Sequence, residues 1–305
     1  MARSRFVGDK GLTARMTLVM FLLGGLFVVL VVGLASAVGG GLGIVIGLAG
    51  IGIAVYQWSR SDKIAMRAMG AREVTPEQAP ELHGMIDRLC ALADMPKPRV
   101  GIADTHVPNA FATGRSPDRA VVCVTTGILQ VLTAEELEGV LAHELSHVAH
   151  RDVLVMTVAS SAGIAAGMLT QGAQYGGLGL LGGRRDNNNG LPVWLVVLVV
   201  SLVVYAVSFV LLRLLSRYRE MSADRAGAYL TMNPGALASA LQKITGEMNT
   251  IPERDLRQVS AASALCIAPA IRGVSLRTLS STHPSLEKRL EQLARIQAEL
   301  GRPTV

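Results

Sequence analysis

The chain has 305 residues, half of them hydrophobic, and a mean hydropathy of +0.41. Soluble domains seldom reach such a value, so we expect membrane-spanning segments. Only three cysteines occur and none forms a CxxC pair, which argues against a disulfide framework and against cysteine as a metal ligand. The net charge of +6 arises from basic residues beside apolar runs. No basic stripe with interleaved aromatics is present, so we expect no nucleic-acid partner.

The first hydrophobic part of the chain is an almost unbroken apolar run over residues 16–58. One membrane span needs about 20 residues, so this run is long enough for two. The glycine-rich sequence AVGGGLG near residue 40 would join them. Because basic residues lie on both sides of the run, the positive-inside rule places both ends in the cytoplasm. We therefore expect residues 1–60 to form a two-span hairpin.

The first polar block covers residues 61–152 and differs in kind from the hairpin. Thr75 and Gln78 have the spacing of a capping box, and Pro76 follows Thr75, so a helix is predicted to begin there. Further along, three short segments rich in β-branched residues are separated by proline and glycine. They predict the strands of a small sheet: PRVGIADT, NAFATG and AVVCVTTGIL.

A second pair of hydrophobic segments covers residues 153–215. The first segment, 153–182, is rich in small residues and suits either a third span or a hairpin at the membrane surface. The second segment, 191–212, predicts a fourth span. Four spans would place both polar blocks on one side of the membrane. The last block, residues 216–305, ends in an amphipathic helix with the sequence SLEKRLEQLARIQAEL.

A candidate metal site lies in the sequence HELSH, within a helix whose start is predicted by the capping box of Thr133 and Glu136. His143 and His147 are four residues apart, so they share one helix face and can bind the same metal ion. Glu144 is placed to act as a general base on a water at that ion. The simpler interpretation is a pair of surface histidines on an amphipathic helix.

A catalytic zinc ion takes three protein ligands, so a third must lie elsewhere. Metzincin proteases extend the motif with a glycine and a histidine at the positions where this chain has His150 and Val153, so the metzincin class is excluded. Glu220 and Asp224 are four residues apart beyond the last apolar segment. One carboxylate could complete the ligand set and the other could orient a histidine. A solvated charged face is the alternative, and the residues alone leave the choice open.

Several segments, in this order, resemble the HtpX family of bacterial membrane-bound heat-shock zinc proteases: PNAFATGRSP, VTTGILQVLTAEELEGVLAHELSHVAHRD, REMSADRAGA and STHPSLEKRLEQL. The family's relatives include the eukaryotic CAAX prenyl endopeptidases. The resemblance implies a gluzincin with one zinc ion per subunit, held by His143, His147 and Glu220, with Glu144 as the base. It implies a supporting role for Asp224, behind the ligands.

The resemblance also implies a fold and a function. The fold is that of a mainly α-helical membrane protein, with about four spans and a cytosolic α+β zincin-like domain that contains a small edge-strand sheet. The function is that of a zinc endopeptidase in stress response and membrane quality control. It would hydrolyse damaged or misfolded membrane proteins at the cytoplasmic face of the bacterial inner membrane. The implied partners are polypeptide substrates, the lipid bilayer and other quality-control proteases.

Three further residues are weaker site candidates. Asn109 could bind the substrate backbone, with its strand pairing to an extended peptide, or it could be an ordinary turn asparagine. His283 could assist the oxyanion, or simply stand at the start of a helix. Arg289 could pair with a site carboxylate or be a solvated helix residue. We expect His83 and His106 to lie on the surface.

Two other classes of protein share parts of this pattern. An intramembrane protease would place the motif inside a span and take an aspartate ligand from an NPDG-like segment. The sequence MNPGAL lacks that aspartate, and Glu135, Glu136 and Glu138 on the motif helix would be costly in hydrocarbon. A non-enzymatic scaffold with a dead protease fold is disfavoured because the ligands and the base are complete.

Overall fold

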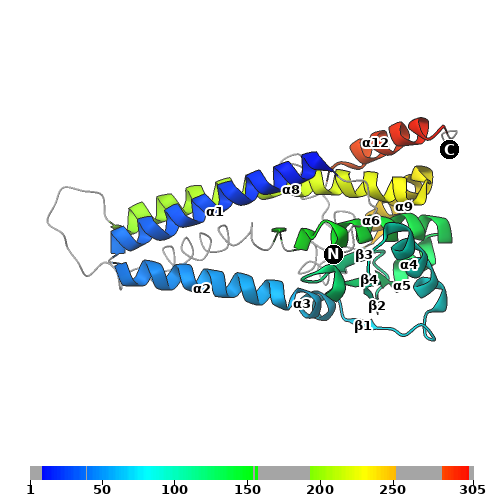
Figure 1. The fold of residues 1–305 in the computed structure, drawn as a ribbon, viewed down its shortest axis with the longest axis horizontal. Coiled ribbons are helices and arrows are strands. Elements are labelled where there is room, and N and C mark those ends of the chain that lie inside the picture. Colours follow the sequence, from blue (N-terminus) through cyan, green and yellow to red (C-terminus); the bar gives the residue numbers. More distant parts are fainter. Residues whose placement is uncertain (1–8, 39, 154, 157–192, 252–283, 302–305) are drawn as a thin grey trace. The chain divides into compact units, whose positions relative to one another are not determined.

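The computed structural model describes residues 9–38, 40–153, 155–156, 193–251 and 284–301 (Figure 1). The chain divides into two compact units. The first comprises Met1–Leu12, Ser59–Leu154 and Ser216–Val305, and the second comprises Thr13–Trp58 and Val155–Leu215. Most of the predicted third hydrophobic segment and His283 lie outside the described residues.

The second unit is helical and rich in exposed apolar side chains. It contains most of helix α1 (Lys10–Val38), helix α2 (Gly40–Ser59) and the first part of helix α8 (Val193–Thr231). The break between α1 and α2 falls where the glycine-rich join was predicted. Exposed large hydrophobic residues line these helices, with Phe21 77% exposed. Among the described residues, Lys10–Leu30 and Leu198–Thr231 are long and apolar enough to cross a membrane. These features fit membrane association.

The first unit is built on a four-stranded mixed sheet. Its strands are β1 (Ala71–Glu73), β2 (Arg99–Ala103), β3 (Ala110–Thr113) and β4 (Val121–Thr125). They are arranged in the order β1-β2-β4-β3, and only the β2–β4 pair is parallel. The three predicted strands are confirmed, but the last four residues of AVVCVTTGIL form the start of helix α5 (Thr126–Val131) and do not belong to β4. Strand β1 was not predicted, because three residues are too few to show an alternating pattern. The order leaves β3 at one edge of the sheet.

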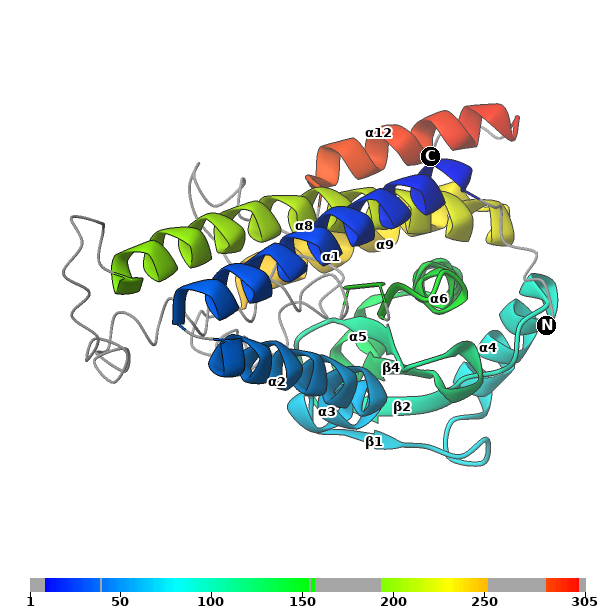
Figure 2. The same cartoon turned by 60° about the vertical axis from the view of Figure 1, so that its left-hand side comes forward.

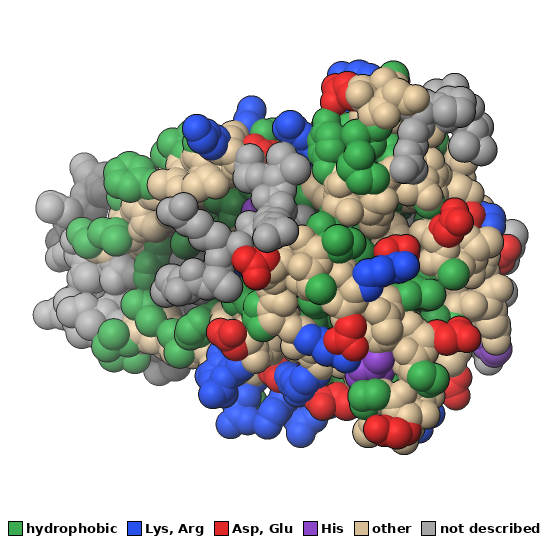
Figure 3. All heavy atoms as spheres, turned by 45° about the vertical axis from the view of Figure 1, so that its right-hand side comes forward, with side chains coloured by type: hydrophobic (Ala, Val, Ile, Leu, Met, Phe, Trp, Pro, Cys, Tyr) green, Lys and Arg blue, Asp and Glu red, His purple; other side chains and the backbone are tan. Residues whose placement is uncertain are grey.

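Helices cover this sheet and carry the site. They are α3 (Ser61–Ala68), α4 (Pro80–Ala93), α5 (Thr126–Val131), α6 (Ala134–Ala149), α9 (Pro234–Thr250) and α12 (Leu286–Glu299), with a 3₁₀ turn, η1 (Pro117–Arg119). Helix α6 packs against β3 and β4 and also against α9, which in turn contacts α12 (Figure 2). The motif helix is therefore enclosed in the core of this unit. At the surface of the same unit, acidic and basic side chains are interspersed (Figure 3).

One predicted helix start is wrong. Helix α4 begins at Pro80, not after Thr75, and the intervening residues form a turn in which the backbone N–H of Gln78 donates to the Thr75 carbonyl. The Thr75 N–H also donates to Gln78 Oε1 at 3.0 Å, so half of the expected capping box exists. A helix that began at Pro76 would meet Pro80 one turn later, where the ring clashes with the carbonyl four residues back. Pro80 is instead favourable at the first helical position.

Candidate metal centre

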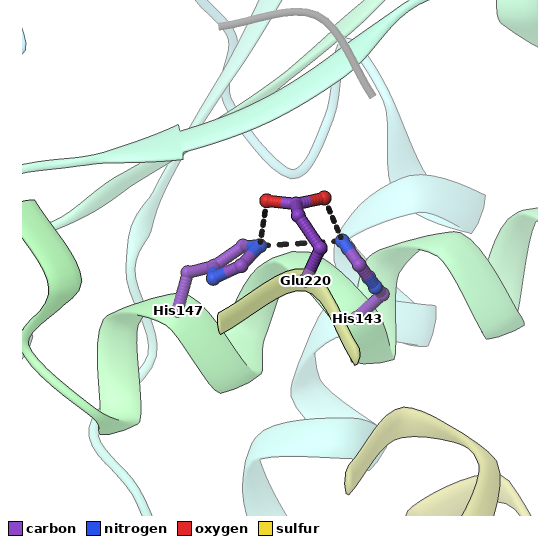
Figure 4. A group of neighbouring side chains, drawn as sticks. All are labelled: His143, His147 and Glu220. Carbon is purple, nitrogen blue, oxygen red and sulfur yellow. Dashed lines mark hydrogen bonds and ion pairs between the residues drawn. The ribbon is translucent and has the colours of Figure 1, made fainter. Parts of the chain in front are cut away.

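Helix α6 presents two imidazole nitrogens, and helix α8 brings a carboxylate beside them. The predicted capping box is present, because Glu136 N donates to Thr133 Oγ1 and Thr133 N donates to Glu136 Oε2 at 2.9 Å. One face of α6 carries His143 and His147, and the Glu220 carboxylate lies beside both imidazoles (Figure 4). The three side chains are buried, at 1%, 9% and 6% exposure respectively.

A glycine allows α8 to approach α6 closely at this point. A Cβ atom at Gly227 would lie 2.9 Å from the backbone nitrogen of His143, closer than real Cβ contacts allow. The atoms that this Cβ would meet belong to the backbone of α6, so a side-chain rotation could not relieve the contact. Glu220 lies about two turns before Gly227 on the same helix and Asp224 about one turn before it, so the missing side chain of Gly227 lets both carboxylates reach the histidines.

The spacing of the acceptor atoms fits a divalent cation. The two Nε2 atoms are 3.2 Å apart, and the Glu220 oxygens lie 3.7 Å from His143 Nε2 and 3.6 Å from His147 Nε2. Ligands of a tetrahedral zinc ion, with bonds of about 2.0–2.1 Å, are separated by about 3.3 Å. Three buried acceptors that converge in this way repel one another unless a proton or a cation lies between them. The residues therefore fit the ion that the motif predicts.

Behind His143 lies a buried carboxylate held by an arginine. Asp224 Oδ1 is 2.9 Å from His143 Nδ1, and its two oxygens accept hydrogen bonds of 2.7 and 2.6 Å from Arg289 Nε and Nη2. The interpretation of Arg289 as a solvated helix residue is wrong, since it is only 3% exposed. Burial opposes a charged His143, but the Asp224 and Glu220 carboxylates outweigh this and raise its pKa to about 10. The site thus favours positive charge at this position.

Behind His147 lies a second arrangement of the same kind. Asp152 Oδ2 is 2.6 Å from His147 Nδ1, and Arg219 Nε is 2.8 Å from the same oxygen. Each of the two histidines therefore has an aspartate at Nδ1, an arrangement that directs the Nε2 lone pair toward Glu220. Sequence reasoning missed Asp152 and Arg219. Asp152 follows the end of α6, so helical spacing could not place it, whereas Arg219 could have been suspected only from its position beside Glu220.

Glu144 lies next to the cluster and also contacts the edge strand. It is 5% exposed, and its Oε2 accepts a hydrogen bond of 2.9 Å from the backbone nitrogen of Ala112 in β3. Burial raises the pKa of this carboxyl above its ordinary value. A carboxylate with a raised pKa is a better proton acceptor near neutral pH.

The asparagine and the two other histidines considered in the sequence lie outside the cluster of His143, His147 and Glu220. Asn109 is 1% exposed and sits just before β3, where its carbonyl accepts hydrogen bonds from the backbone nitrogen and Oγ1 of Thr125. His106 is exposed, as predicted. The prediction for His83 is wrong, because this residue is 7% exposed and its Nε2 lies 3.0 Å from the carbonyl oxygen of Val74. That position ties α4 to the segment after β1.

Two histidines on one helix, a glutamate beside them and a carboxylate from a later helix define a gluzincin-like metallopeptidase centre. Comparison with known proteins gives the family. The model of Peptidase family M48 matches residues 76–297. The chain is 53% identical over 300 residues to "Protease HtpX homolog 1" of Streptomyces coelicolor, which covers 98% of this chain and 97% of the relative. It is 51% identical over 298 residues to "Protease HtpX homolog" of Moorella thermoacetica, covering 98% of both.

A solved structure shows the same fold. The crystal structure of S. mikatae Ste24p superposes with a TM-score of 0.53 at 17% identity, and the match covers 91% of this chain and 64% of the Ste24p chain. The match to the family model and the identity to the two HtpX relatives show that the chain belongs to Peptidase family M48 and is a metalloprotease of the HtpX type.

Proposed function

We propose that this chain is a zinc-dependent endopeptidase anchored in the bacterial inner membrane, with its site on the cytoplasmic side. The observation that carries the proposal is the convergence of His143, His147 and Glu220 beside Glu144. In this assignment the three converging residues are the zinc ligands and Glu144 is the general base. One zinc ion per chain follows from a single cluster of this kind among the described residues.

The chain's own residues divide the work of peptide hydrolysis between them. A bound zinc ion would supply Lewis acidity, polarising the scissile carbonyl and making water more acidic. Glu144 accepts a proton from the water that attacks the carbonyl carbon. It then donates that proton to the leaving amine nitrogen. Its hydrogen bond from Ala112 N holds the carboxylate in place between the two transfers. Asp224 and Asp152 keep the imidazoles in the tautomer that directs Nε2 toward the ion.

Among the described strands, β3 lies at an edge of the sheet, which supports substrate binding by strand addition. Backbone nitrogen and oxygen atoms in an antiparallel pair face the partner strand at alternate residues. Asn109 pairs with Thr125 of β4, so Ala110 and Ala112 turn their backbone groups away from the sheet. The Ala112 N–H already donates to Glu144, so an extended peptide could hydrogen-bond to the backbone groups of Ala110 and to the Ala112 carbonyl, and place its own carbonyl beside Glu144. Asn109 would then help through its backbone position, because its side chain is buried.

Two further parts of the proposal are that the substrates are membrane proteins and that the site faces the cytoplasm. They are supported by sequence similarity and by the membrane-facing parts of the chain. The chain is similar throughout its length to HtpX-type proteases, and its exposed apolar helices fit a bilayer. Basic residues flank the apolar runs, which favours a cytoplasmic location for both polar blocks. Four spans would satisfy this arrangement. Damaged or misfolded membrane proteins are then the substrates within reach, and other quality-control proteases are possible partners.

Metal removal tests the proposed activity. Purified protein in detergent is expected to cleave casein and an unfolded membrane protein, and to lose this activity completely after treatment with a zinc chelator. Restoring zinc at one equivalent per chain should restore cleavage, because the three ligands form a single site. Cleavage rates are measured by gel or fluorescence, with calcium re-addition as the control. Activity that persists in fully zinc-free protein would contradict the proposal.

Replacing Asp152 by asparagine is expected to weaken zinc binding about 10- to 100-fold, because the partner that orients His147 loses its charge. Arg219 also loses its ion-pair partner, so some loss of thermal stability is expected. Zinc affinity is measured by chelator competition, and activity is measured at saturating zinc, where it should largely recover. Asp118→Asn, an exposed carboxylate in η1, is the matched control. Unchanged zinc affinity in Asp152→Asn would show that His147 needs no such support.

A further inference from the structure

A small pocket adjoins the candidate metal centre and has no role in the mechanism above. It lies between the end of β3 and the end of α6, and its lining includes Ala112, Thr113, Arg115, His147 and Arg151. Because His147 is one of the proposed zinc ligands, the pocket opens beside the reaction centre. Because Ala112 belongs to β3, the edge strand of the sheet as far as the chain is described, a peptide that pairs with this edge would pass the pocket with its side chains.

The pocket carries two arginines that are not committed to any carboxylate within the described part of the chain. Arg219 and Arg289 at the metal centre are different, since both lie against buried aspartates. No ion pair joins Arg115 or Arg151 to any described residue. Arg115 is half-buried and Arg151 is exposed. Two positive charges on one small pocket therefore remain available to a ligand.

The backbone at Arg151 strengthens this observation. Its φ angle is +57°, in the left-handed region where a side chain costs conformational energy and glycine does not. The residue ends α6, at a position where glycine is the usual choice. Its side chain is exposed, so burial of apolar surface does not repay this cost. A strained residue held beside a reaction centre suggests a role for its side chain.

We propose that this pocket is a substrate subsite that binds an acidic side chain, aspartate or glutamate, close to the scissile bond. Arg115 and Arg151 would donate hydrogen bonds to the carboxylate, which guanidinium groups bind in a bidentate manner. The inference rests on the proposed peptidase activity and adds a sequence preference to it. The competing explanation for Arg151 is a basic residue that flanks the following hydrophobic segment and serves only membrane insertion.

The subsite is tested with quenched fluorescent peptides. The peptides of a set are identical except at one position near the cleaved bond, which is glutamate, glutamine or lysine. Wild-type protein loaded with zinc should prefer glutamate over glutamine by about tenfold in kcat/KM at one such position, the size expected for hydrogen bonds to a charged group. The preference should decline as salt is added, since the pocket is open to solvent. No preference at any position would overturn the inference.

Substitutions in the pocket test whether its two arginines cause the preference for glutamate. Arg151→Gly removes the guanidinium and relieves the left-handed backbone, so Tm should be unchanged or higher while the preference for glutamate is lost. Arg151→Glu should reverse the preference toward lysine, and Arg115→Gln should reduce it. Arg119→Gln is the matched control, because Arg119 is exposed in the same loop but does not line the pocket. Arg119→Gln should keep both the wild-type rate on glutamine peptides and the preference for glutamate, and each pocket variant is judged by its ratio of glutamate to glutamine cleavage.

The outcomes separate this inference from the proposed function. Cleavage of neutral peptides without any acidic preference overturns the subsite and leaves the peptidase intact. Failure of the wild-type protein to cleave any peptide overturns both. If Arg151→Gly reduces the amount of protein inserted in membranes but keeps the preference for glutamate, the arginine serves insertion and the subsite assignment is wrong.

Discussion

Glu144→Gln is expected to lower kcat/KM for casein cleavage by about 10³-fold or more, in the upper part of the range for loss of a general base. Glutamine has the same shape but cannot accept a proton from the attacking water. It can still accept the hydrogen bond that Ala112 N donates to Glu144 Oε2. The contact between α6 and β3 should therefore persist. Burial of a charged carboxylate is unfavourable, so Tm should not fall.

Zinc content distinguishes this result from damage to the site. Glu144 is not one of the proposed ligands, so Glu144→Gln should bind one zinc ion per chain with wild-type affinity. Glu135→Gln, an exposed residue in the first turn of the same helix, is the control and should keep full activity. A Glu144→Gln variant with wild-type cleavage rates would refute the role of Glu144 as base. The same result would reopen the question of a scaffold without catalysis.

The part of the site that lies on one helix could be predicted from the sequence. The spacing of His143 and His147 fixes their common face, and the capping box of Thr133 and Glu136 fixes the start of the helix. Glu220 is separated from them by a hydrophobic pair of segments, so no local rule connects the two. Only the family resemblance assigned it, and the structure brings its carboxylate beside both imidazoles.

The supporting contacts depend on tertiary packing, so the sequence left Asp224 and Arg289 as open alternatives and did not indicate Asp152 or Arg219. Asp152 reaches His147 only because the chain reverses at Arg151, whose positive φ ends the helix. Arg289 belongs to an amphipathic helix with many charges, and nothing in its sequence distinguishes it from its exposed neighbours. Its burial follows from packing of that helix near Asp224. The same limit explains why His83 was predicted to be exposed.

Glu220→Ala is expected to abolish stoichiometric zinc binding and, with it, cleavage activity. The variant keeps two imidazoles but loses the only negatively charged group among the three proposed ligands. Replacing a residue that only orients a ligand lowers metal affinity about 10- to 100-fold, so the loss of zinc affinity in Glu220→Ala should be larger than this. Glu220→Gln should also bind weakly, because a neutral amide oxygen is a poorer ligand for zinc than a carboxylate. Metal content is measured on purified protein after dialysis, and affinity by chelator competition.

A control on the same helix shows whether the loss is local. Arg225 is exposed on α8, one residue beyond Asp224, and Arg225→Ala should retain one zinc ion per chain. Circular dichroism should show the same helix content in both variants, because α8 is stabilised by its long apolar part and by its packing on α6. Wild-type zinc affinity in Glu220→Ala would exclude Glu220 as a ligand. Since no other cluster of three candidate ligands occurs among the described residues, the third ligand would then have to come from outside them.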